Sequence, residues 1–181
     1  MEKSTESTVW TADQSHSEIE FAVRHMMIST VKGNFGKFSI EAHGSEKSPE
    51  NASVVVVIDP SSINTREPDR DNHLKSPDFF DIEKYKEIRF QSTSITEKSE
   101  GKYAIKGNLT IRDVTKEITF EGDLEGIIKD PYGKTRAGIT VTGEIVREEF
   151  GLKWNMVIEA GKFMVGSRIK FTAHAEMIVQ E

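Results

Sequence analysis

The chain has 181 residues, a length that suits one domain with a core large enough to fold unaided. Valine and isoleucine together number 31, leucine only 4, and 14 threonines raise the β-branched total to 45, so the composition favours strands and excludes a helical bundle. The formal net charge of −6 excludes an overall positive field for nucleic acid or anionic membranes, and the lack of cysteine excludes disulfides and thiolate chemistry.

The first seven residues lack the alternating apolar pattern that the rest of the chain shows. Residues 1–7 are predicted to be a disordered polar tail, and patterned segments from residue 8 to residue 181 predict a single domain without a linker. The tail lacks the apolar stretch of a signal peptide, and no uncharged apolar run approaches the roughly 20 residues that span a bilayer. We therefore expect a cytoplasmic protein without an integral membrane segment.

Segments with two-residue periodicity follow one another with short turns, which predicts an antiparallel sheet. The first places Ile19, Phe21, Val23 and His25 on one face, and the next changes parity at Gly36, as a bulge or bend requires. Further strands are predicted at residues 52–58, 88–90, 103–111, 118–128, 137–145 and 169–179. About eight such strands avoid bare edges by closing into a barrel, which has just enough interior for a small ligand.

Residues 62–86 break the strand pattern with two prolines and clustered charges. Ser76 followed by Pro77 matches a helix cap with proline in the first turn, and Leu74, Phe79 and Phe80 supply apolar surface to bury. This segment is predicted to be a short helical insertion in an all-β fold. A second irregular region is expected at residues 148–166.

Small residues alternate with large ones on the predicted inner faces, among them Gly107, Gly122, Gly126, Gly143 and Ala173. A solid core would fill such positions, because unfilled volume costs roughly 24 cal/mol per Å³. Two interpretations are open: the glycines leave room for a ligand, or they merely let the strands coil. A cavity lined by Phe, Ile, Val and Leu would take an apolar chain, and a few polar groups at one end would set specificity.

An ordered set of motifs extends along most of the chain. It comprises His16-Ser17-x-x-x-Phe21-x-x-x-His25, Val31-x-Gly33-x-Phe35-x-x-Phe38, Ser62-Ile63-x-Thr65, Arg70-Asp71-x-His73-Leu74-x-Ser76-x-x-Phe79-Phe80-Asp81, Tyr85, Ile88-x-Phe90 and Gly107-x-Leu109-Thr110-Ile111. In this combination the chain, from about residue 8 to its end, resembles the YceI-like family of lipid-binding proteins. The resemblance implies an extended, lipocalin-like β-barrel that holds a long isoprenoid, such as a polyprenyl phosphate or quinone tail, or another amphiphile. It implies no catalytic residues.

Four residues are candidates for binding a ligand head-group: His25, Arg66, Arg70 and His73. His25 extends an inward row, so it would either bond a head-group or be satisfied within the core. The other three would bind an anionic or carbonyl head-group, unless both arginines pair with nearby acidic side chains.

The predicted barrel lining is mainly aromatic and aliphatic. Two of its members, Phe79 and Phe80, would plug or line one end of the barrel, or only anchor the helical segment. The full set comprises Phe21, Val23, Phe35, Phe38, Leu74, Phe79, Phe80, Phe90, Ile105, Gly107, Leu109, Ile118, Phe120, Gly122, Val141, Gly143, Phe171 and Ala173.

The acidic and histidine side chains of residues 69–81 give only weak support to a zinc site. An EF-hand counted from Asp69 would place Leu74 where glycine is needed and Phe80 where glutamate is needed. The sequence also lacks HExxH, Walker A, GxGxxG and GxSxG motifs, so no metal, cofactor or catalytic residue is predicted.

Three functions are compatible with these features. The first is non-catalytic binding, sequestration or transport of a polyisoprenoid or other long-chain amphiphile. The alternative is an enzyme that acts on a lipid or quinone inside the barrel, with His25 or His73 in acid–base catalysis. The third is an interaction module with a filled barrel. A homodimer is possible in each case, and nucleic acid is not an expected partner.

Overall fold

A computed structural model describes residues 7–181, so the predicted tail lies outside the described residues apart from residue 7. The fold is built from strands with one α-helix, α1 (Pro68–Lys75), among the described residues. The strands are β1 (Thr8–Ala12), β2 (Glu18–His25), β3 (Ser29–Phe35), β4 (Phe38–Ser45), β5 (Ser48–Ile58), β6 (Ile63–Asn64), β7 (Ile88–Ser99), β8 (Lys102–Ile111), β9 (Val114–Lys129), β10 (Thr135–Val146) and β11 (Val165–Val179).

Eight strands form a closed antiparallel ring in the order β1-β4-β5-β7-β8-β9-β10-β11, and the ring closes where Trp10 of β1 pairs with Val179 of β11. Strand β11 is long enough to pair with β1 near one end and with β2 along most of its length. Strands β3 and β6 continue the sheet beyond β2. The predicted eight-stranded antiparallel barrel is confirmed, although β1 was not expected as one of its strands.

The inward-facing residues predicted from two-residue alternation agree with the structure in β8 and differ from it in one part of β9. In β8, the five residues from Tyr103 to Ile111 on the inward face are all buried. In β9, the register with β10 shifts between Gly138 and Ile139, which inserts a bulge and reverses the faces beyond it. The prediction that Gly126 and Ile128 point inward is therefore wrong, and Ile128 is 65% exposed.

The helix begins nine residues earlier than the sequence predicted, at Pro68 instead of Pro77. Pro68 occupies the first turn of α1, and the Glu67 carboxylate caps it by accepting from the backbone N–H groups of Asp69 (3.3 Å) and Arg70 (2.7 Å). Ser76 is the C-cap, so Pro77 follows the helix instead of starting it. The prediction of a helical insertion is right, and its assignment of the capping proline is wrong.

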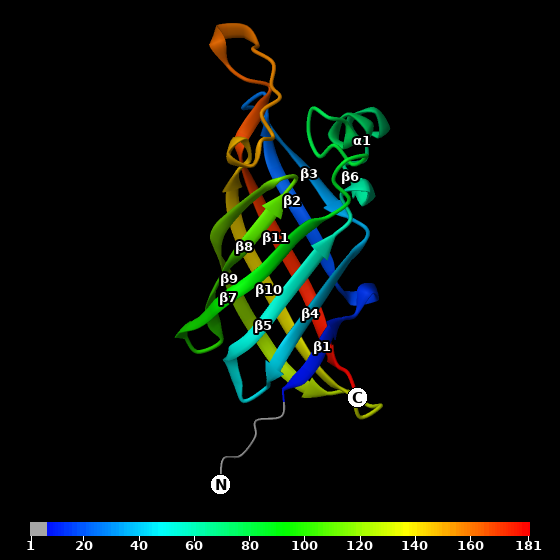
Figure 1. Ribbon diagram of the computed structural model, residues 1–181, viewed down its shortest axis with the longest axis vertical. Helices are drawn as coiled ribbons and strands as arrows, with labels where there is room; N and C mark the ends of the chain where they lie inside the picture. The colour runs from blue at the N-terminus through cyan, green and yellow to red at the C-terminus, as the bar shows by residue number, and fades with distance from the viewer. Residues whose placement is uncertain (1–6) are drawn as a thin grey trace.

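The two ends of the barrel are connected differently (Figure 1). At the lower end, tight turns join β4 to β5, β7 to β8 and β9 to β10. At the upper end lie the two long connections, residues 59–87 with α1 and residues 147–164 between β10 and β11. Long surface connections on a rigid barrel are where binding residues usually lie.

Arg136 gathers three carboxylates near the lower end. Its guanidinium donates to Asp130 (2.7 Å), Asp13 (3.1 Å) and Glu176 (2.5 Å), and Asp130 also accepts from the backbone N–H groups of Tyr132 and Lys134. The Arg136 bond, followed by the Lys134 N–H, lowers the pKa of Asp130 below its usual range. This network ties the β9–β10 turn to the neighbouring strand β11 and to the residue that follows β1.

A lowered carboxylate pKa makes the fold sensitive to acid. The stabilisation by Asp130 is complete above its unfolded pKa of about 3.9 and is lost as the pH falls through the lower folded value. We expect Asp130→Asn to lower the melting temperature at neutral pH and to flatten its decline below about pH 4. Melting curves across this range test it, with the exposed turn variant Asp113→Asn as control, and an unchanged acid slope would contradict it.

Candidate ligand cavity and its mouth

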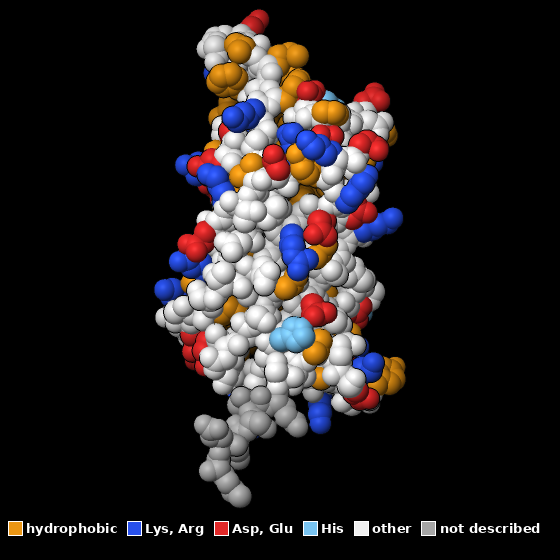
Figure 2. Space-filling view, in the orientation of Figure 1, with side chains coloured by type: hydrophobic (Ala, Val, Ile, Leu, Met, Phe, Trp, Pro, Cys, Tyr) orange, Lys and Arg blue, Asp and Glu red, His pale blue; other side chains and the backbone are white. Residues whose placement is uncertain are grey.

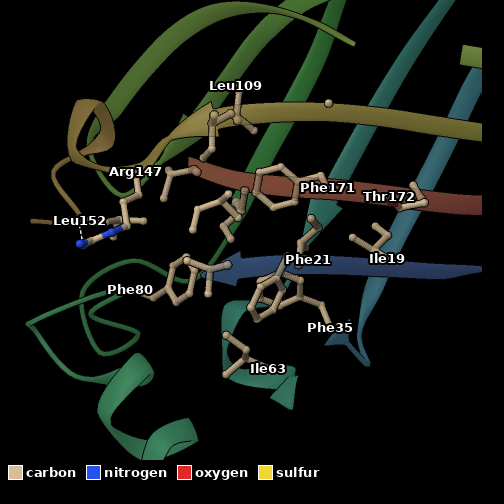
Figure 3. A pocket seen from close by; sticks show the side chains of 18 of the residues that line it. Ile19, Phe21, Phe35, Ile63, Phe80, Leu109, Arg147, Leu152, Phe171 and Thr172 are labelled. Atoms are coloured by element: carbon tan, nitrogen blue, oxygen red, sulfur yellow. Dashed lines mark hydrogen bonds between the residues drawn. The ribbon is translucent and has the colours of Figure 1, made fainter. Parts of the chain in front are cut away.

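A cavity of about 570 Å³ lies inside the barrel, a size within the roughly 300–1,000 Å³ range of small-molecule sites. Its wall consists mainly of isoleucine, valine, leucine and phenylalanine side chains from both sides of the ring. Figure 3 shows Phe21, Phe35 and Phe171 projecting into it from different strands. A wall of this kind favours hydrocarbon and disfavours charged groups.

The lower part of the barrel interior is filled by aromatic side chains. Trp10 and Tyr103 are 7% and 8% exposed and do not line the cavity. The Trp10 indole Nε1 donates to the Gly44 carbonyl at 3.3 Å, and burial raises the pKa of the Tyr103 hydroxyl. The cavity therefore stops short of Trp10 and Tyr103 and extends at its other end to residues of α1.

The inward glycines seat aromatic rings and do not leave space open. A side chain at Gly143 would overlap the Phe120 ring, and one at Gly107 would overlap the Phe90 ring. Gly33 receives the Phe21 ring in the same way. The glycines therefore make room for the cavity indirectly, because each accepts a ring that would otherwise project toward the barrel axis. Rings that lie over glycine stay close to the wall and leave the barrel axis free.

Most of the predicted lining residues border the cavity, and four do not. Phe38 and Ile118 are half-buried against the core elsewhere, while Gly107 and Gly122 are covered by the Phe90 ring and by the Ile105 side chain. The predicted residues on the wall are Phe21, Val23, Phe35, Leu74, Phe79, Phe80, Phe90, Ile105, Leu109, Phe120, Val141, Gly143, Phe171 and Ala173.

Polar side chains gather at the upper end of the cavity, which we call the mouth. It is lined by His25, Glu67, Asp69, Arg70, His73, Arg147, Trp154 and Met164. They come from β2, from α1 and the residue that caps it, and from the connection that precedes β11. The cavity is thus apolar along its length and polar at one end. The cavity therefore matches an amphiphile, which has an apolar chain and a polar head-group at one end.

Arg70 is fixed by Thr65, the buried residue that precedes the helix. Its Nε donates to the Thr65 hydroxyl and its Nη2 to the Thr65 carbonyl, both at 2.8 Å. Thr65 in turn donates to Asp71 Oδ1 through its hydroxyl (2.6 Å) and its N–H (2.9 Å). Arg70 therefore presents a positive charge at the mouth with its orientation set from behind.

His73 joins α1 to the connection before β11. Its Nε2 lies 2.8 Å from Asp78 Oδ2, and its ring packs edge-on against Trp154 (4.6 Å between centroids) and Phe79 (5.2 Å). Phe79 also contacts Trp154, and Phe80 packs edge-on against Phe35. The two phenylalanines thus line the mouth and anchor the helical segment at once.

The other two head-group candidates lie in different surroundings. The His25 imidazole borders the cavity, is half-buried and makes no hydrogen bond to another residue of the described chain. It is not a histidine satisfied within the core. Arg66 is exposed, adopts a positive φ of 65° and does not border the cavity. The structure does not bring Arg66 together with the other three.

Arg147, which sequence analysis did not single out, is the most deeply buried charge of the mouth, with 2% of it exposed. It donates to the carbonyls of Leu152 (2.6 Å), Gly166 (2.8 Å) and Trp154 (2.9 Å), and at 3.3 Å to that of Val165. Figure 3 shows it turned toward Leu152 at the edge of the cavity. Burial lowers its pKa.

The sequence does carry a signal for Arg147. It continues the inward row of β10 two residues beyond Ile145, where an apolar side chain is expected. A charged residue in such a position needs several partners, and the carbonyls of an irregular connection supply them.

Comparison with known proteins agrees with this architecture. Residues 10–177 match the family described as YceI-like domain. The chain belongs to the YceI-like family. Over 175 residues this YceI-like chain is 40% identical to a UPF0312 protein of Staphylococcus aureus (strain bovine RF122 / ET3-1), covering 96% of this chain and 99% of the relative.

Solved structures share the barrel of this YceI-like chain. A Campylobacter jejuni YceI protein is 30% identical with a TM-score of 0.77, covering 87% of this chain and 90% of the other. Burkholderia cenocepacia BcnA has a TM-score of 0.80 at 19% identity, covering 91% and 98%. A polyisoprenoid-binding domain from Saccharophagus degradans has a TM-score of 0.69 at 12% identity, covering 95% and 98%. The last two likenesses establish the fold alone.

The helices of this YceI-like chain are short. Within residues 7–181, none has both the length and the apolar character that a membrane-spanning helix requires.

Proposed function

We propose that this protein binds a polyisoprenoid or another long-chain amphiphile without transforming it, and so sequesters or carries the molecule. The observation that carries the proposal is the apolar cavity of about 570 Å³ with its polar groups confined to the mouth. Membership of the YceI-like family and the polyisoprenoid-binding domain of the same fold support it. The apolar chain lies among the phenylalanines, and the head-group stays at the mouth.

Arg70 and the His25 imidazole are the groups that would bind the head-group. Arg70 is held in place by Thr65, and the His25 imidazole makes no hydrogen bond to another described residue. Together they suit an anionic or carbonyl head-group, because both donate and one is always charged. His73 would act by positioning, since its ring is already packed between Trp154 and Phe79.

The enzyme alternative would need an acid–base group beside the reacting atoms. His73 has a carboxylate partner in Asp78, but its edge-on packing against two aromatic rings favours a structural role. Non-catalytic binding therefore explains the contacts of the mouth residues better than the enzyme alternative does.

Blocking the cavity tests the proposal. We expect Ala173→Trp, which places a large ring on the cavity wall, to reduce binding of geranylgeranyl phosphate at least tenfold, because it takes up the space of the chain. The control is His174→Trp, the next residue of β11, which is exposed on the opposite face. Native mass spectrometry of delipidated protein measures the bound fraction.

Two results would overturn the proposal. One is that the wild type binds neither geranylgeranyl phosphate nor the uncharged geranylgeraniol. The other is that Ala173→Trp folds, as judged by circular dichroism, and still binds as tightly as His174→Trp.

A further inference from the structure

Two connections meet at the upper extremity of the barrel and form a projection that is held together by backbone hydrogen bonds (Figure 1). One is the β2–β3 turn, and the other is the segment 153–164, which we call the finger. The Met26 N–H donates to the Met164 carbonyl at 2.8 Å and joins them. Within the finger, the Met164 N–H donates to the Met156 carbonyl (2.9 Å) and Val157 pairs with Phe163. The projection has a defined shape of its own.

This projection exposes large apolar side chains, which we call the tip: Met27 (51% exposed), Ile28 (75%), Met156 (50%), Val157 (65%) and Phe163 (53%). Figure 2 shows hydrophobic side chains gathered at this extremity of the molecule. Single exposed apolar residues are ordinary, but a cluster on one projection marks an interaction site.

The backbone of the β2–β3 turn is unfavourable for the residues that it carries. Met26 and Met27, its two central residues, have positive φ values of 50° and 60°, a conformation that asparagine and glycine adopt more readily. The turn thus accepts a local conformational cost while presenting Met27 to solvent.

The tip is continuous with the mouth. Met164, which lines the mouth, accepts the Met26 N–H bond that joins the turn to the finger, and His25, also in the mouth, directly precedes Met26. Trp154 lies at the base of the finger. An apolar chain that leaves the cavity at its upper end emerges beside the tip. A surface that receives the tip would therefore also receive the ligand.

The local charge of the projection favours an anionic lipid surface. Residues 24–28 and 153–164 contain Arg24, Lys153 and Lys162 against the single acid Glu159, a balance of +2 in a chain whose formal net charge is −6. Basic residues around exposed apolar side chains fit anionic head-groups above hydrocarbon. The overall negative charge does not prevent this, because salt screens charges that lie beyond about 8–10 Å.

We propose that the tip docks onto an anionic lipid bilayer, with its apolar side chains at the boundary between head-groups and acyl chains, so that a ligand passes between the bilayer and the cavity. This inference rests on the proposed function for the identity of the cargo. The docking itself rests on the tip and its basic residues.

Vesicle flotation tests the docking. The wild type is expected to float with phosphatidylcholine vesicles that contain phosphatidylglycerol. Ile28→Ser with Phe163→Ser should lower the partition coefficient about tenfold or more, because two apolar side chains no longer enter the bilayer. The matched control is Ile128→Ser with Tyr132→Ser, which removes two large side chains of still greater combined exposure (65% and 89%, against 75% and 53%) from the β9–β10 hairpin at the opposite end.

A charge variant separates the electrostatic contribution. Lys153→Gln with Lys162→Gln should lower binding about tenfold on vesicles with phosphatidylglycerol and leave binding to pure phosphatidylcholine unchanged. The proposal is overturned if the wild type does not float. It is equally overturned if the two serine double variants float alike, or if sedimentation shows that the tip joins two copies of the chain and the monomer does not bind vesicles.

Failure of the docking and failure of the proposed function are distinguishable. Binding of geranylgeranyl phosphate in the absence of vesicles reports the cavity alone and should be the same in the wild type and the tip variants. Flotation without ligand binding would retain the docking and reject the proposed cargo. Ligand binding without flotation would reject the docking only.

Discussion

Replacing Arg147 by methionine is expected to lower the free energy of unfolding by about 3 kcal/mol or more, because it leaves buried carbonyls of the 152–166 segment without a donor. Methionine fills most of the volume and supplies no donor. Hydrogen exchange of the finger should rise at the same time, since the guanidinium bonds the carbonyls on both sides of it. Urea unfolding and amide exchange measure the two effects.

The control for this variant is Arg168→Met on the neighbouring part of β11. Arg168 is 71% exposed and pairs with Glu144 at 2.6 Å, so its loss should cost less than about 1 kcal/mol. Arg147→Lys should not restore stability, because an ammonium group cannot reproduce the planar fork that reaches several carbonyls. Equal stabilities of Arg147→Met and Arg168→Met would contradict the role given to Arg147.

Gly143→Val is expected to destabilise the barrel by about 2–3 kcal/mol and to reduce ligand binding, because the new side chain displaces the Phe120 ring toward the cavity. Pairing the substitution with Phe120→Ala should recover part of both losses, since the ring and the side chain compete for one space. A double-mutant cycle on unfolding free energy and on binding measures the coupling.

Gly126→Val is the matched control in the same barrel. Sequence alternation placed Gly126 on the inner face with Gly143, whereas in the structure no atom lies within 4 Å of the position of an added Cβ. Valine is favoured in strands, so the change should be neutral or slightly stabilising. The account of the glycines is contradicted if Gly143→Val is tolerated as well as Gly126→Val.

Much of the fold follows from alternation, and the failures have local causes. The row from Tyr103 to Ile111 is read correctly, because a regular strand has a fixed period of two. The row beyond Leu124 is not, because a bulge adds a residue without a distinct sequence signal. The helix start was misplaced because both Pro68 and Pro77 follow a residue that can cap a helix, and only packing decides between them.

The sequence predicts the wall of the cavity but not the contacts between its strands and connections. The apolar wall follows from the strand pattern, and most of its predicted residues border the cavity. The role of the glycines depends on which ring crosses from the neighbouring strand, as Phe120 does at Gly143, and a sequence does not state cross-strand register. The partners of Arg147 are backbone carbonyls of an irregular connection, which have no residue signature.

A crystal structure with a brominated long-chain amphiphile shows whether the chain occupies the cavity. We expect anomalous peaks from bromine at the chain end deep in the barrel, between Phe171 and the wall formed by β5 and β7, with the head-group near Arg70 and His25. Peaks found only on the outer surface, with the interior closed by the phenylalanine side chains, would contradict the proposed binding.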